Sequence, residues 1–177
     1  MKSYLILTAA GPDRPGIVDE VSAALAQRGL NIESSRMAVL GGEFALILLA
    51  SGEAAEIQKL AASPQTIGEP AGLTVSAKKA APPESRVLPA SLPYRLAASG
   101  MDHPGIVHEI SRVLHSFQVN IEALDTQVAP APVSGAPIFT MQAVLAVPAA
   151  VKIKQLKAAL DELSDSLNMD IEFEAEE

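Results

Sequence analysis

Apolar and polar residues alternate in short runs along the chain, and the runs are separated by segments with helical spacing. A period of two is typical of a half-buried strand, and apolar residues three or four positions apart are typical of a helix face. In the first half, the pattern predicts a strand around Leu5–Ala9, a helix with Ile17, Val21, Ala24 and Leu25 on one face, strands over Leu30–Leu40 and Phe44–Ala50, a short helix near Glu53–Ala62, and a strand over Leu73–Ala77.

The second half shows the same order of elements. The pattern predicts a strand near Tyr94–Ser99, a helix over Gly105–Phe117, strands near Val119–Ala129 and Ile138–Val147, a helix with Ile153, Leu156, Leu160 and Leu163 on one stripe, and a last strand from Met169 to Glu174. In this last strand, acidic residues alternate with apolar ones, which indicates one face in water and one in the core.

The two halves are copies of one unit. Residues 11–33 and 100–122 are identical at twelve of 23 positions, each offset by 89 and without a gap. The shared string is Gly-x-Asp-x-Pro-Gly-Ile-Val, followed by Asn-Ile-Glu. We therefore predict two domains, 1–78 and 92–177, joined by a Pro-rich linker over 79–91.

The order β-α-β-β-α-β predicts an α+β fold, the ferredoxin-like arrangement, in which helices cover one face of a four-stranded antiparallel sheet. In the first copy, the residues expected on the bare face are largely apolar: Tyr4, Ile6, Ala45, Ile47 and Leu49. Their counterparts in the second copy are more polar. We infer that the bare face of the first copy is covered, either by the second copy or by another chain; the alternative is an apolar surface that stays exposed.

Composition excludes several classes of function. Thirteen Lys and Arg against 21 Asp and Glu give a net charge of −8, which argues against contact with nucleic acid or an anionic membrane. There is no cysteine, so thiolate catalysis and Cys-based metal sites are excluded. No segment is long enough to span a bilayer, and the apolar start of the chain is interpreted as a strand instead of a signal peptide. These features predict a cytoplasmic protein with no metal and no cofactor.

The repeated turn has the chemistry of a small zwitterion site. Exposed N–H groups at Gly16 and Ile17, where the helix begins, favour a carboxylate. Asn31 offers both a donor and an acceptor, and Asp13 can accept from an α-ammonium group. The strand order is expected to place the turn and Asn31 opposite each other.

Structural roles compete with these interpretations. We interpret Asp13 and Asp102 as helix caps in preference to ligand contacts, and Pro15 as the first residue of its helix. For Asn31 and Asn120, ligand contact and support of a turn both stay open.

The repeated Asp-x-Pro-Gly-Ile-Val followed by Asn-Ile resembles the ACT domain, a small amino-acid-binding regulatory module. A free-standing pair of such domains with Asp-Arg-Pro-Gly resembles the glycine cleavage system transcriptional repressor family. ACT domains bind ligands where two of them meet, at the strand-to-helix turn and the start of the second strand. The resemblance therefore implies these ligand-binding residues: Asp13, Arg14, Gly16, Ile17, Asn31, Asp102, His103, Gly105, Ile106 and Asn120.

The two sets of residues differ in charge. Several amino-acid-binding ACT domains carry Asn where this chain has Asp13 and Asp102, and a carboxylate there repels a ligand carboxylate. Arg14 can offset this repulsion in the first copy, whereas His103 does so only when it is protonated. The two sites are therefore expected to be unequal, or one of them to be purely structural.

We predict a non-catalytic regulator. The chain has no phosphate-binding loop, nucleophile elbow or dinucleotide fingerprint, and after two repeats no residues remain for a catalytic domain. The predicted ligand is a small amino acid such as glycine. The predicted partner is a protein, such as a transcriptional activator, with further copies of the chain pairing through sheet faces or edges. The alternatives are a detached regulatory subunit of a metabolic enzyme and an interaction module without a ligand.

Overall fold

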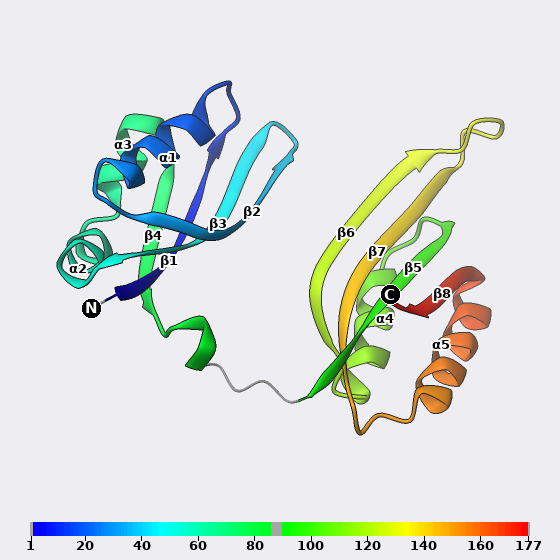
Figure 1. Ribbon diagram of the computed structural model, residues 1–177. Helices are drawn as coiled ribbons and strands as arrows, with labels where there is room; N and C mark the ends of the chain where they lie inside the picture. Colours follow the sequence, from blue (N-terminus) through cyan, green and yellow to red (C-terminus); the bar gives the residue numbers. More distant parts are fainter. Residues whose placement is uncertain (1, 86–89, 177) are drawn as a thin grey trace. The chain divides into compact units, whose positions relative to one another are not determined.

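A computed structural model describes residues 2–85 and 90–176. The chain divides into two compact units, Met1–Val87 and Leu88–Glu177, called domain 1 and domain 2 below. Each unit contains one four-stranded sheet with helices on one of its faces (Figure 1). The predicted α+β class and the two βαββαβ units are confirmed.

Domain 1 contains these elements in chain order: β1 (Lys2–Pro12), α1 (Ile17–Ala26), β2 (Asn31–Leu40), β3 (Glu43–Glu53), α2 (Ala54–Ala62), α3 (Gln65–Ala71) and β4 (Thr74–Ala80). The sheet order is β2-β3-β1-β4, and every neighbouring pair is antiparallel. A hairpin at Gly41-Gly42 joins β2 to β3, with both glycines at positive φ.

Domain 2 repeats this arrangement with β5 (Ser91–Met101), α4 (Ile106–Ser116), β6 (Asn120–Pro130), β7 (Pro137–Pro148), α5 (Ile153–Leu167) and β8 (Met169–Ala175). Its sheet order is β6-β7-β5-β8, again antiparallel throughout. A short 3-10 turn, Pro83–Ser85, follows β4 near the end of domain 1. Strand β4 runs to Ala80 and β5 begins at Ser91, so regular structure extends into both ends of the predicted linker; residues 86–89 of that linker lie outside the described residues.

Each domain has its own apolar core between sheet and helices. The predicted inward residues of β1 and the predicted face of α1 are buried in domain 1, including Leu5, Leu7, Val21 and Leu25. The core of domain 2 is built in the same way around Ile110, Leu114, Leu156 and Leu160. The two cores share no residue, because each sheet buries its own helix-facing side chains.

Domain 1 contains a helix that the hydrophobic pattern did not predict. The expected single helix near residues 53–62 is followed by α3, which contains Pro70 and Gly68. Ser63 lies directly before Pro64 and leaves the helical region, because a proline disfavours helical backbone at the preceding residue. In domain 2 the corresponding segment is the single helix α5.

Candidate functional site

The turn between the first strand and the first helix is built alike in both domains. The N–H of Asp13 donates to the carbonyl of Gly42 at 2.9 Å, and the N–H of Asp102 donates to that of Pro137 at 3.0 Å. These bonds hold each turn against the adjacent hairpin end. Ile17 and Ile106 are only 2 % exposed, so these two residues belong to the cores of their domains and their side chains are not available to a ligand.

Glycine provides the cap of both helices. Gly16 has φ 91° and Gly105 has φ 102°, values that favour glycine, and their carbonyls accept from the N–H groups of Glu20 and Glu109. The first N–H groups of a helix have no partner within it, so each turn presents donors to an anion. Neither helix has a side-chain cap bond.

This geometry corrects two predictions. Asp13 and Asp102 are not helix caps, because each lies three residues before the left-handed glycine that caps its helix. Pro15 lies in the turn that precedes α1 and is not its first residue. Both predictions were wrong because Ser, Thr, Asn and Asp are the usual cap residues, and here glycine takes their place.

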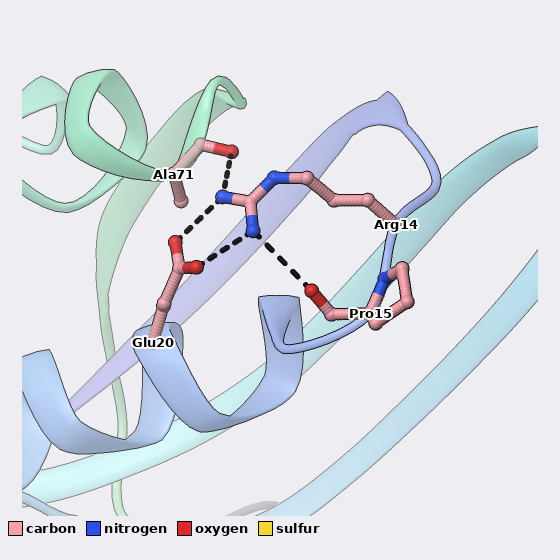
Figure 2. Close-up of polar contacts among 4 residues, drawn as sticks. All are labelled: Arg14, Pro15, Glu20 and Ala71. Carbon is pink, nitrogen blue, oxygen red and sulfur yellow. Dashed lines mark hydrogen bonds and ion pairs between the residues drawn. The ribbon is translucent and has the colours of Figure 1, made fainter.

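Arg14 ties the turn of domain 1 to two helices (Figure 2). Its Nη1 and Nη2 donate to Oε1 and Oε2 of Glu20 at 2.6 and 2.7 Å, and Nη2 also donates to the carbonyl of Ala71 at 3.2 Å. Nη1 lies 3.4 Å from the carbonyl of Pro15. The fork of two bonds from Arg14 lowers the pKa of the Glu20 carboxyl. The guanidinium predicted to meet a ligand is therefore engaged within the domain.

The turn of domain 2 lacks this tie. His103 stands at the position of Arg14, and its Nδ1 lies 3.2 Å from the carbonyl of Pro104. Glu109, the counterpart of Glu20, pairs instead with Arg112, which donates to it at 2.6 and 3.0 Å and lowers the pKa of its carboxyl. The carboxylate of Glu109 is thus paired within α4 and does not bind the turn.

Asn31 and Asn120 do not lie opposite the turns of their own domains. Asn31 pairs with Ser51, and Ser51 pairs with Tyr4, near the beginning of β1. The turn follows the other end of β1, nine residues from Tyr4, which is about 30 Å of strand. The same register holds for Asn120, Ala146 and Pro93 in domain 2.

The prediction that the turn and the amide face each other within one domain was therefore wrong. Strands β1 and β2 are both antiparallel to β3, so they run in the same direction and begin at the same end of the sheet, where the strands start. Helix α1 returns the chain to that end before Asn31. A ligand that contacts a turn and an amide together needs them from different ACT domains.

Asn31 belongs to a polar cluster that sequence reasoning missed. The Glu33 carboxylate accepts from Asn31 Nδ2 at 3.1 Å, from Lys2 Nζ at 2.8 Å, and from Ser51 Oγ. Ser51 is only 1 % exposed, and the register of β2 shifts beside it, between Ile32 and Ser34. The repeated Asn-Ile-Glu was the only available signal for this cluster.

Three donors on one carboxylate have a measurable consequence. The bonds from Lys2, Ser51 and Asn31 lower the pKa of Glu33 from 4.5 to about 2. Because the pKa is lower in the folded chain, the stabilisation is present above about pH 4.5 and is lost as the pH falls towards 2. In domain 2 the sheet positions of Lys2 and Ser51 hold Ser91 and Ala146, so Glu122 lacks these two donors.

We expect Lys2→Ala to raise the pKa of Glu33 towards its ordinary value, since Lys2 is the largest cause of the shift. The side-chain carboxyl resonance of Glu33, followed by NMR during an acid titration, measures the change. The control is Lys59→Ala, which removes an exposed lysine that pairs with Glu56. A Glu33 titration that is the same in both variants contradicts the assigned role of Lys2.

Two kinds of site are absent from the described parts of the chain. No group of three or more His, Asp or Glu residues in 2–85 and 90–176 is arranged to hold a metal ion. No helix within these residues combines the length and the apolar character required to cross a membrane.

Two ferredoxin-like modules in tandem, each with a glycine-capped turn between its first strand and first helix, define the class of protein to which the chain belongs. The family model of the ACT domain matches residues 3–78 and 96–174, and the chain belongs to this family. It is a distant homologue of the glycine cleavage system transcriptional repressor of Escherichia coli (strain K12), with 29% identity over 165 residues, 93% of this chain and 86% of the relative.

Solved structures show the same two-domain architecture. A protein from Galdieria sulphuraria is 35% identical and superimposes with a TM-score of 0.86 over 100% of both chains. A second solved structure is 25% identical, with a TM-score of 0.72 over 99% of each chain. The similarity therefore extends over both domains.

Proposed function

We propose that this protein is a non-catalytic sensor that binds a small amino acid such as glycine and changes its affinity for a protein partner. Two observations support the proposal: the glycine-capped turn that presents helix N–H groups in both domains, and the homology to a transcriptional repressor over 93% of the chain. The proposed partner is a transcriptional activator. Direct DNA binding is not part of the proposal, because residues 92–177 carry five basic and twelve acidic residues.

The ligand carboxylate would accept from the first N–H groups of α1 or α4, and an amide of Asn31 or Asn120 would hold the other end of the ligand. Since the turn and the amide of one domain lie about 30 Å apart along the strand, each complete site would combine residues from two ACT domains. This is the arrangement that the ACT resemblance implies. Regulation follows if the ligand binds the partner-free and partner-bound states with unequal affinity.

The two amides are expected to contribute unequally. Asn31 already donates to Glu33, whose carboxylate is also held by Lys2 and Ser51. In domain 2 the corresponding donors are replaced by Ser91 and Ala146, so Asn120 is not in competition with an equivalent cluster. We therefore assign the larger share of ligand binding to Asn120.

We expect Asn120→Ala to weaken glycine binding at least about tenfold, since a hydrogen bond to a charged group is lost. Asn31→Ala, which removes the equivalent amide of the first repeat, is the matched comparison and is expected to have a smaller effect. Isothermal titration calorimetry with glycine measures both. Equal affinity in the wild type and both variants contradicts the assigned role of the amides.

A thermal-shift panel of the twenty amino acids tests the sensor proposal as a whole. A ligand that binds the folded chain raises the melting temperature. If no amino acid does so at millimolar concentration, the proposed sensing function is wrong. Co-purification from the native host then distinguishes a transcriptional activator from a metabolic enzyme as the partner.

A further inference from the structure

The helix-free faces of the two sheets carry different side chains at equivalent positions. In domain 1, two cross-strand rows on this face run from β2 to β4: Arg36, Ile47, Thr8 and Ser76 form one, and Ser34, Leu49, Ile6 and Lys78 form the other. These residues point away from the helices because their strand neighbours, such as Leu7 and Leu48, lie in the core. The centre of this face is apolar, with Ile47 48 % exposed, and each outer strand carries one basic residue.

The same rows in domain 2 have the opposite charge. They consist of Asp125, Gln142, Ala97 and Glu172, and of Ala123, Val144, Arg95 and Glu174. Asp125 occupies the position of Arg36, and Glu174 occupies that of Lys78. The one basic residue in these rows, Arg95, donates to Glu176 at 2.6 and 3.1 Å, which leaves the two outer strands acidic.

The shapes of the two faces differ in a matching way. Domain 2 has a shallow hollow of about 270 Å³ over its sheet, with small residues such as Ala97, Ala123 and Val144 on its floor and Asp125 and Glu174 at its borders. Domain 1 has the larger Ile6, Ile47 and Leu49 at the centre of its face, between Arg36 and Lys78. Bulky apolar side chains with a basic border thus complement a hollow with an acidic border.

The geometry points to a homodimer in which the helix-free face of domain 1 packs on the helix-free face of domain 2 from a second copy of the chain. Basic residues lie on both outer strands of one face and acidic residues on both outer strands of the other. Basic residues therefore meet acidic residues whether the strands of the two faces run parallel or antiparallel to each other. Two faces of the same kind would instead bring like charges together, which costs free energy.

The size of the contact favours a closed dimer. A four-stranded sheet is about 19 Å wide, and about 20 Å of strand length gives a face of about 400 Å². Two-fold symmetry makes the contact twice, so the dimer buries about 1,600 Å² in total, the size of a standard stable interface. The exposed Ile47 and the half-buried Ile6 and Leu49 then leave water, which provides the main driving force.

Charge reversal in the full-length chain tests this dimer by sedimentation equilibrium over a range of protein concentrations. We expect the wild type to dimerise, and Arg36→Glu with Lys78→Glu to raise the dissociation constant at least about tenfold. Asp125→Lys with Glu174→Lys should have a similar effect. Combining all four substitutions should restore the dimer, because the two faces then exchange their charges.

The matched control is Lys59→Glu with Lys154→Glu. It changes the net charge by the same amount as the reversal in domain 1, but at exposed positions on α2 and α5. The control should dimerise like the wild type, and circular dichroism checks that every variant is folded.

A wild type that sediments as a monomer at every protein concentration overturns the proposal. The proposal is also overturned if Arg36→Glu with Lys78→Glu raises the dissociation constant of the dimer no more than the control does. Glycine binding is measured separately by calorimetry, so failure of the dimer is distinguishable from failure of the sensor proposal.

Discussion

Replacing Leu25 by alanine is expected to lower the free energy of unfolding of domain 1 by about 2–5 kcal/mol. Leu25 is fully buried at the last turn of α1, where it packs in the core beneath the sheet. Truncation removes apolar contacts and leaves a cavity that the sheet and the neighbouring helices fill only in part. Urea unfolding followed by circular dichroism measures the loss.

The control for Leu25→Ala lies on the same helix. Val18 is 52 % exposed, and Val18→Ala is expected to change the stability by no more than about 0.5 kcal/mol. Native-state hydrogen exchange assigns the change to a domain, since Leu25 contributes to the core of domain 1 alone. If both variants show the same small loss, α1 does not pack as described.

Gly68→Ala is expected to destabilise domain 1 by about 3 kcal/mol. A Cβ at this position in α3 would clash with the carbonyl oxygen of Leu73 and would lie 2.7 Å from Val75 Cγ2. The nearer atom belongs to the backbone, so helix and strand would have to move apart. The displacement of α3 would also weaken the bond from Arg14 Nη2 to the carbonyl of Ala71.

Urea unfolding measures the loss of stability in Gly68→Ala. The control is Glu69→Ala, which substitutes the exposed neighbouring residue on α3. The exchange rate of the Leu73 amide, which donates to the carbonyl of Gly68, gives a local measure of the same contact. Wild-type stability and exchange in Gly68→Ala would show that the chain does not require the close approach of α3 and β4.

The repeat and the alternation of apolar residues were sufficient to predict the two sheets and the order of the helices and strands along the chain. Leu5, Leu7 and Leu25 are core residues in the structure because a period of two or of 3.6 is a direct consequence of backbone geometry. Helix α3 could not be predicted in this way. Its Pro70 and Gly68 are poor helix formers, and the helix forms because Ile67 and Ala71 pack into the core.

The candidate site was predicted less completely than the fold. The residues of the turn were found because the chain repeats them, but the position of Asn31 depends on strand direction and register, which no local pattern contains. Glu33 was missed as the centre of a cluster for the same reason. Its partners Lys2 and Ser51 lie on β1 and β3, far from it in the sequence, and meet only in the folded sheet.

The opposite charges at Arg36 and Asp125, and at Lys78 and Glu174, have a consequence for the origin of a two-domain chain. A lone domain that pairs with itself through one face must carry both signs of charge on that face, because only then can each charge meet its opposite across the two-fold axis. Once the module is duplicated within a single polypeptide, each copy can accumulate its own charge, and self-recognition becomes selective without a second gene. Duplication thus supplies a pair of unlike surfaces in a fixed one-to-one ratio.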